Sequence, residues 1–203
     1  MIVGLSGYAQ VGKDSIGQIL VEDYDFKRYA FADALRSVVY ALNPLLDDGV
    51  RVQEVIDKSG WEWAKVNVPE VRRLLQSMGT EAGRKVLGEN VWVEAVFNQI
   101  HHNSLNVVIT DVRFPNEAQR IKAEGGFVVR VTRPGVSAVN AHPSETSLDE
   151  WGFDLSIPNN GTKEDLRLLA KDGLQKLQTM HDTLSFPSVR LPGYGSPVAK
   201  VVR

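Results

Sequence analysis

The chain begins MIVGLSGYAQVGKDSIGQIL (residues 1–20), and this stretch decides the fold. Its first six residues include Ile2, Val3 and Leu5, which predicts a buried strand, and apolar residues recur at helical spacing after Lys13. Between the two lies GYAQVGK (residues 7–13), a G-x4-G-K loop in the context that a phosphate-binding loop requires. The stretch therefore predicts a strand, a phosphate loop and a helix, in that order.

The chemistry of this loop favours a polyphosphate. Its two glycines let backbone N–H groups turn toward phosphate oxygens, the helix directs the positive end of its dipole at them, and a lysine adds a full charge. A Gly-rich turn arising by chance is the alternative. We expect the loop and the two residues after it to bind ATP; these are Gly7, Tyr8, Ala9, Gln10, Val11, Gly12, Lys13, Asp14 and Ser15.

The position after the loop lysine departs from the usual motif. Asp14 stands where Ser or Thr ordinarily holds Mg2+, and Ser15 comes one place later. A carboxylate is also a good Mg2+ ligand, directly or through water. We therefore expect Mg2+ as a cofactor and leave its ligand open between Asp14 and Ser15.

Composition limits the other classes of protein. The chain has 203 residues, and 25 acidic against 23 basic side chains leave a net charge of -2, which gives no support to a nucleic-acid partner. The absence of cysteine excludes disulfides and cysteine-ligated metals, and no stretch reaches the roughly 18 apolar residues of a membrane span. We expect a soluble, cytoplasmic protein of one domain that binds neither nucleic acid nor a membrane.

Strands and helices alternate along the rest of the chain, which predicts an α/β fold with helices on both faces of a parallel sheet. Pro69 is expected at the first position of a helix that Gly79 interrupts, and the form of residues 45–68 is left open. We expect residues 1–184 to form the domain, with a lid over about 133–153, and residues 185–203 to form a Pro- and Gly-rich basic tail. The pattern predicts strands over 27–31, 105–110, 127–132 and 155–157, and helices over 34–42, 69–78, 92–100, 115–122 and 166–180.

A second group of candidate residues follows the buried strand at 105–110. Asp111 stands at its carboxyl end, where ligands bind in open α/β sheets, and resembles the acid of a Walker B motif. Arg113 comes two residues later, so a phosphate with Mg2+ would satisfy both signs of charge. An ion pair between Asp111 and Arg113 that caps the next helix is the structural alternative.

Two further positions have competing interpretations. Arg72, Gln76 and Arg84 recur at helical intervals, so they either face a monophosphate and a base or form a solvated helix face. Asp33 follows the second strand, where it either caps the next helix or faces the acceptor of a transferred group.

Six blocks of sequence together resemble the deoxynucleoside monophosphate kinases of tailed bacteriophages. The most specific is DVRFPNEA (111–118), and the ordered set covers residues 7–162. The resemblance implies a P-loop NTPase fold, a three-layer parallel sheet with a lid, that transfers the γ-phosphate of ATP to a deoxynucleoside monophosphate. It also implies the cytoplasm of an infected host cell if a phage encodes the chain. The other blocks are GKDS (12–15), FADAL (31–35), LLQSMGTE (74–81) with Arg84, HPSE (142–145) and NNGT (159–162).

The same resemblance implies a role for individual residues. Arg133 is expected to close over the phosphates, and Asn160 with Gly161 to line the adenine. The small-molecule substrate is the acceptor, and the chain is left open between a monomer and a homodimer. The expected catalytic residues are Lys13, Asp33, Asp111 and Arg113, the acceptor ligands are Asp33, Arg36, Gln76, Arg84, Arg113 and Asn116, and the metal ligands are Asp14, Ser15 and Asp111.

Other functions share the phosphate loop. A kinase of the phosphomevalonate or dephospho-coenzyme-A type would accept a different phosphate, and a P-loop NTPase would hydrolyse ATP without an acceptor. A binding protein would hold ATP and transfer nothing. Gln76 favours an acceptor with a base edge, and the joint presence of Lys13 and Asp111 favours catalysis.

Overall fold

A computed structural model describes residues 1–101, 106–138 and 146–185. Five strands form one sheet in the order β2-β3-β1-β4-β5, and every neighbouring pair is parallel, which confirms the predicted α/β class. The central strand β1 therefore delivers the phosphate loop to the middle of the sheet's carboxyl edge. The strands are β1 (Ile2–Ser6), β2 (Lys27–Tyr29), β3 (Val107–Val112), β4 (Phe127–Thr132) and β5 (Leu155–Pro158).

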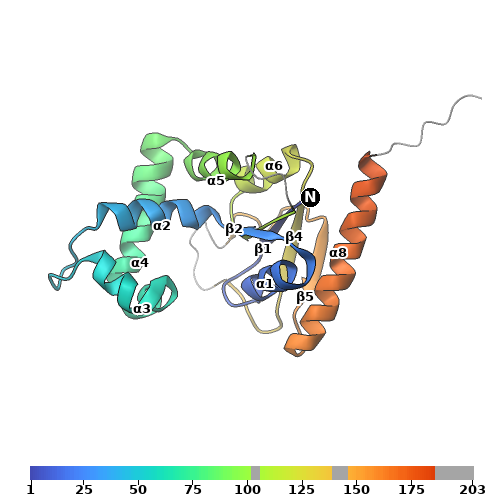
Figure 1. The fold of residues 1–203 in the computed structure, drawn as a ribbon, viewed down its shortest axis with the longest axis horizontal. Helices are drawn as coiled ribbons and strands as arrows, with labels where there is room; N and C mark the ends of the chain where they lie inside the picture. The colour runs from blue at the N-terminus through green and yellow to red at the C-terminus, as the bar shows by residue number, and fades with distance from the viewer. Residues whose placement is uncertain (102–105, 139–145, 186–203) are drawn as a thin grey trace, which may run out of the picture.

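Helices cover both faces of this sheet (Figure 1). On one face lie α1 (Lys13–Tyr24) and α8 (Lys163–Ser185), and on the other lie α5 (Val91–His101) and α6 (Pro115–Ala123). Successive strand residues point to opposite faces, so Val108 packs with α1 and α8 while Ile109 packs with α5 and α6. Burial on both sides explains the nearly continuous apolar sequence of the central strands.

A lobe of helices extends from one end of the sheet (Figure 1). It contains α2 (Phe31–Leu42), α3 (Val52–Asn67), α4 (Pro69–Gln76) and a π-helix, η1 (Ser77–Leu87). The segment whose form the sequence left open is thus largely α3, which Gly60 breaks with φ 74° and ψ 163°. The lobe has a core of its own, made of Val39, Leu46, Val52, Ile56, Ala64 and Val71.

Two local predictions for this lobe are wrong. Helix α2 begins at Phe31, in place of the predicted end of a strand, so Asp33 lies in its first turn and Ala30 is the N-cap. Gly79 does not interrupt the helix, which continues as η1. Its missing side chain serves packing instead, because a Cβ there would lie 3.0 Å from Leu35 Cδ2, and Trp92 Nε1 donates to its carbonyl oxygen at 2.9 Å.

The two ends of the predicted lid are described. Residues 133–138 follow β4, and residues 146–150 form a turn that buries Leu148. The block HPSE (142–145) and the tail after residue 185 lie outside the described residues, and Ser185 closes α8 instead of opening the tail. Within the described residues, no helix is long and apolar enough to cross a membrane.

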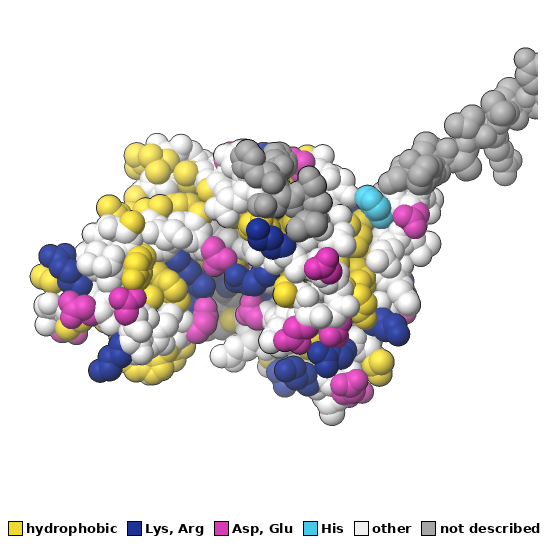
Figure 2. Space-filling view, in the orientation of Figure 1, with side chains coloured by type: hydrophobic (Ala, Val, Ile, Leu, Met, Phe, Trp, Pro, Cys, Tyr) yellow, Lys and Arg dark blue, Asp and Glu magenta, His cyan; other side chains and the backbone are white. Residues whose placement is uncertain are grey.

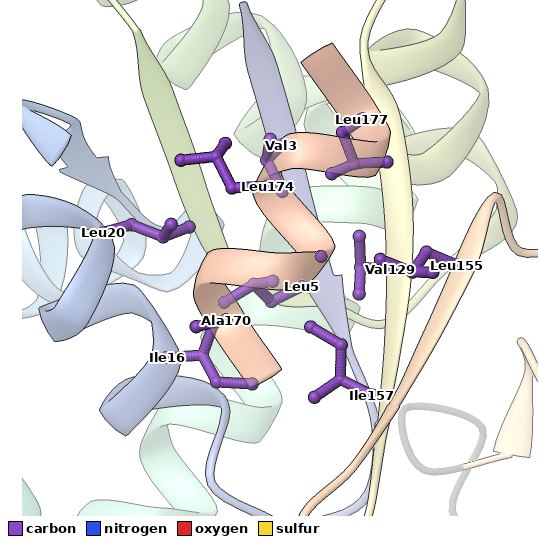
Figure 3. Close-up of a pocket in the computed structure, with 11 residues that line it drawn as sticks. Val3, Leu5, Ile16, Leu20, Val129, Leu155, Ile157, Ala170, Leu174 and Leu177 are labelled. Carbon is purple, nitrogen blue, oxygen red and sulfur yellow. The ribbon is translucent and has the colours of Figure 1, made fainter. Parts of the chain in front are cut away.

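A small cavity lies among side chains of α8, α1 and the sheet (Figure 3). Only apolar side chains and Gly173 line it, so it is a gap in the core and offers a ligand no hydrogen-bonding side chain. The lining residues are Val3, Leu5, Val129, Leu155 and Ile157 from the sheet, Ile16 and Leu20 from α1, and Ala170, Gly173, Leu174 and Leu177 from α8.

Replacing Gly173 by alanine is expected to stabilise the protein. The new Cβ would lie 3.1 Å from Leu155 Cδ2 and 3.2 Å from Ile157 Cδ1, and both side chains can move into the cavity that they line. Alanine is also favoured over glycine within a helix by about 1 kcal/mol. The melting temperature of Gly173→Ala, followed by circular dichroism, should rise by about 2–4 °C. A fall would show that the two neighbours cannot yield.

Candidate active site

The phosphate loop joins β1 to α1 as the sequence predicts. Lys13 is the first residue of α1, and its ammonium donates to the carbonyl oxygens of Gly7 at 2.6 Å and Tyr8 at 2.7 Å. The side chain is only 7% exposed. The structure therefore folds the lysine back over the loop, where its charge lies beside the turning backbone.

Both glycines of the motif are required by the shape of the loop. Gly7 has φ 142° and Gly12 has φ 104°, values that residues with a side chain rarely adopt. A Cβ at Gly7 would collide with the carbonyl oxygen of Val131, and one at Gly12 would lie 2.5 Å from Asn159 Nδ2. The loop is thus a close-packed cradle with no room for larger residues at these two positions.

Asp111 joins the sheet to the helical lobe. Its Oδ1 accepts the N–H of Phe31 at 2.8 Å and its Oδ2 accepts the N–H of Ala32 at 2.9 Å. Removal from solvent raises the pKa of Asp111, while these N–H groups and the nearby Arg113 act in the opposite direction. Asp111 therefore performs the capping that the sequence allowed for Asp33, and the helix it caps is α2 rather than the helix that follows it.

Glu117, to which the sequence gave no role, is the most buried carboxylate of the site at 2% exposed. Its Oε1 accepts from Arg84 at 2.6 Å, and its Oε2 accepts the N–H groups of Arg113 at 2.7 Å and Phe114 at 3.1 Å. Burial, and then the charge of Asp111, raise its pKa to about 7. A Glu three residues after the helix N-cap is the local signal that would have identified it.

Two predicted acceptor ligands have partners within the chain. The Arg84 guanidinium pairs with Glu117 and stacks 4.2 Å from the centre of the Phe114 ring. Asn116 Nδ2 donates to Asn90 Oδ1 at 2.8 Å and to the Glu89 carbonyl oxygen at 3.2 Å. Both contacts fasten α6 to the end of η1 and the start of α5.

A chain of ion pairs crosses from the sheet into the helical lobe. Arg28 pairs with Asp33 at 2.8 Å, Asp33 with Arg36 at 3.6 Å, and Arg36 with Glu62 of α3 at 2.8 Å. Figure 2 shows acidic and basic side chains side by side where the lobe meets the sheet. The predicted residues Asp33 and Arg36 therefore lie together, while Gln76 is exposed on α4.

The predicted ATP residues near the end of the sheet do not contact the phosphate loop in any hydrogen bond of the described residues, whereas a neighbouring residue does. Arg133, Asn160 and Gly161 are exposed beyond β4 and β5. Asn159, for which the sequence predicts no role, is buried, and its Nδ2 donates to the Val11 carbonyl oxygen of the phosphate loop at 2.8 Å. The block NNGT (159–162) was the available signal, but its first asparagine is the one that reaches the loop.

Comparing the wild type with Glu117→Gln should reveal the titration of this buried carboxylate. The folded pKa of about 7 lies above the ordinary value of 4.5, so between these pH values the folded chain holds a proton that the unfolded chain has released. The stabilisation is complete below pH 4.5 and is lost as pH rises through 7. The unfolding free energy of the wild type minus that of the variant should fall by on the order of 1–3 kcal/mol from pH 5 to 8.

Urea denaturation at pH 5, 6, 7 and 8 measures this difference. Parallel pH profiles of the two proteins would contradict the shifted pKa of Glu117.

A family model and several relatives in sequence point to the same family. The family model described as deoxynucleotide monophosphate kinase matches residues 47–169. A protein of Acanthamoeba polyphaga mimivirus is 29% identical over 181 residues, covering 81% of this chain and 91% of its own. The deoxynucleotide monophosphate kinase of Enterobacteria phage T4 is 28% identical over 132 residues, covering 63% of this chain and 52% of its own.

A third relative and two solved structures are also similar to this chain. The deoxynucleoside-5'-monophosphate kinase of Escherichia phage T5 is 42% identical over 87 residues, which cover 34% of this chain and 35% of that one. The shikimate kinase of Aquifex aeolicus (TM-score 0.46, 13% identity) covers 89% of this chain and 98% of its own. The dephospho-CoA kinase of Campylobacter jejuni has a TM-score of 0.46 and 13% identity, and the match covers 87% of this chain and 96% of that chain.

The match of the family model spans more than half of the chain, from the segment between α2 and α3 through the start of α8, and includes both Asp111 and Glu117. This chain belongs to the deoxynucleotide monophosphate kinase family.

Proposed function

We propose that this protein transfers the γ-phosphate of ATP to a deoxynucleoside monophosphate, giving ADP and the deoxynucleoside diphosphate. The observation that carries the proposal is the Lys13 ammonium, held over the loop oxygens of Gly7 and Tyr8 in a chain of this family. Phosphoryl transfer needs aligned oxygens and neutralised charge, with no covalent intermediate on the protein. A cradle of N–H groups with one buried cation supplies that neutralisation.

The residues near the loop fit Mg2+ as a cofactor. Asp14, Ser15 and Asp111 offer only oxygen donors, the type that Mg2+ prefers. Asp14 is exposed at the start of α1, whereas both oxygens of Asp111 already accept backbone N–H groups and keep a lone pair each for a further ligand. When bound, Mg2+ would neutralise charge on the phosphates, and Asp14, Ser15 and Asp111 would hold it.

The acceptor is proposed to lie between the sheet edge and the helical lobe. Asp33, Arg36 and Arg113 come from α2 and the loop after β3, which Asp111 ties together. In this arrangement Arg113 supplies charge to the monophosphate, and Gln76 on α4 supplies an amide to the base. Arg84 and Asn116 are assigned to holding this region in place through Glu117 and the start of α5.

The turn at residues 146–150 supports the proposed lid. Tyr8 of the phosphate loop donates its hydroxyl to Asp149 at 3.0 Å, and Arg130 pairs with the same carboxylate at 2.8 Å. The Arg130 guanidinium lies 4.8 Å from the centre of the Tyr8 ring. These contacts connect the loop to the described end of the lid, whose closure over ATP would exclude water and so limit hydrolysis.

A coupled ADP-release assay with dTMP, dGMP, dCMP, dAMP and the ribonucleotides tests the function. Turnover should require a nucleoside monophosphate and Mg2+. Hydrolysis at the same rate without an acceptor would instead identify an NTPase, and turnover confined to phosphomevalonate or dephospho-coenzyme A would identify the other kinase types.

Lys13→Ala should abolish most of this activity while leaving the fold intact. The ammonium contacts the loop backbone, so its loss removes charge from the phosphate cradle and not from the apolar core. Losing such a clamp should lower kcat/KM by a factor on the order of 10²–10³. Circular dichroism controls for folding, and wild-type turnover in the variant would end the proposal that this loop binds the transferred phosphate.

Arg113→Lys and Arg84→Lys should differ in their effects. Lysine keeps the charge but loses the planar fork that suits a phosphate, so Arg113→Lys should raise the acceptor KM much more than the ATP KM. Arg84→Lys removes a guanidinium stacked on Phe114 and paired with buried Glu117, so it should lower the melting temperature and affect both substrates. Steady-state kinetics and thermal denaturation measure the two. A selective acceptor effect of Arg84→Lys alone would reverse the assignment.

A further inference from the structure

The side-chain amide of Asn159 is buried and contacts the phosphate loop, although Asn159 lies 148 positions after Val11 in the sequence. Asn159 directly follows the edge strand β5 and is 8% exposed. Its Nδ2 donates to the Val11 carbonyl oxygen at 2.8 Å, and its backbone N–H donates to the Thr132 carbonyl oxygen at 2.7 Å. The second bond fixes Asn159 to the end of β4, so the amide holds the loop against the sheet.

This contact determines the orientation of one peptide group. In a trans peptide the carbonyl and the following N–H point in opposite directions. With the Val11 carbonyl directed at Asn159, the N–H of Gly12 is directed away from it. The Val11 side chain is itself buried in the core, and Gly12 has φ 104°, so packing fixes one end of this peptide and the other end requires a glycine.

Gly12 and Asn159 are also matched in size. A Cβ at Gly12 would lie 2.5 Å from Asn159 Nδ2 and 3.5 Å from its Cγ. The missing side chain of the loop glycine is what lets the amide approach the carbonyl of the preceding residue. The G-x4-G-K motif therefore needs this glycine for contact with Asn159 as well as for the turn.

We infer that Asn159 is a positioning residue for ATP, which fixes the Val11–Gly12 peptide so that the Gly12 N–H faces the phosphates. It acts through the loop and does not itself touch the nucleotide, unlike its exposed neighbour Asn160, which is assigned to the adenine. The inference rests on the proposed function, because it assumes that the loop receives the phosphates of a nucleotide.

The test replaces the amide by groups that cannot make the contact. In Asn159→Asp a carboxylate oxygen faces the Val11 carbonyl oxygen in place of a donor, and the charge lies beside the phosphate loop. Asn159→Ser is too short to reach the carbonyl and adds no charge. Asn67→Asp is the matched control, since Asn67 Nδ2 also donates to a backbone carbonyl, that of Trp63 at 2.9 Å, but on the exposed surface of α3.

Calorimetric titration of each folded variant with ADP and with the acceptor monophosphate gives the result. Because the lost bond orients a group that faces charged phosphate, the ADP Kd of Asn159→Asp should rise by about tenfold, and that of Asn159→Ser by a smaller factor. The acceptor Kd should stay within about twofold of the wild type for both, as should both Kd values of Asn67→Asp.

Three outcomes would overturn the inference. The first is an ADP Kd within about twofold of the wild type in a folded Asn159→Asp protein. The second is equal weakening of ADP and of the acceptor, and the third is failure of both variants to fold, since either would make Asn159 a purely structural residue. A wild-type protein that binds ADP but phosphorylates no acceptor would overturn the proposed function, while the ADP comparison would still decide the role of Asn159.

Discussion

Two hydrogen bonds to one carboxylate connect the parts of this molecule. Asp111, at the end of β3, accepts the first N–H groups of α2, and α2 carries the helical lobe. The free N–H groups of a helix start need acceptors, and a carboxylate there also stabilises the helix dipole. The position of the lobe relative to the sheet therefore depends on a side chain near the end of β3, the strand that pairs with β1. Asp111 thus links the lobe to the sheet edge from which the phosphate loop leaves.

A second carboxylate stabilises the next layer of this arrangement. Glu117 holds the backbone that carries Arg113 and at the same time the guanidinium of Arg84 from η1. Burying a carboxylate beside Asp111 costs free energy, which is why the pKa of Glu117 rises to about 7. The guanidinium of Arg84 and the N–H groups of Arg113 and Phe114 offset part of that cost. Because these partners come from η1 and from the turn before α6, Glu117 fixes that turn to the helical lobe.

Secondary structure, which depends on neighbouring residues, can be predicted from this sequence, whereas hydrogen bonds between residues far apart in the chain cannot. The five strands, the phosphate loop and most helices follow from periodicity and from glycine and proline signals. The sequence suggests Asp33 as a cap of α2, because nothing in it indicates that Asp111, 80 positions after Phe31, accepts the first N–H groups of this helix. The contact of Asn159 with Val11 spans 148 positions, and no periodic pattern announces a single hydrogen bond of that kind.

The distribution of buried polar groups separates the site from the core. In the described part of the chain the buried polar residues are Ser6 and Thr110 in the second halves of β1 and β3, Lys13 and Glu117 in the first turns of α1 and α6, and Asn159 directly after β5. A buried polar group is costly unless it is hydrogen-bonded. The bonds of Lys13, Glu117 and Asn159 offset this cost and fix the phosphate loop and the turn before α6. The cavity under α8 is the contrast, because its apolar lining can loosen or tighten packing but cannot orient a phosphate.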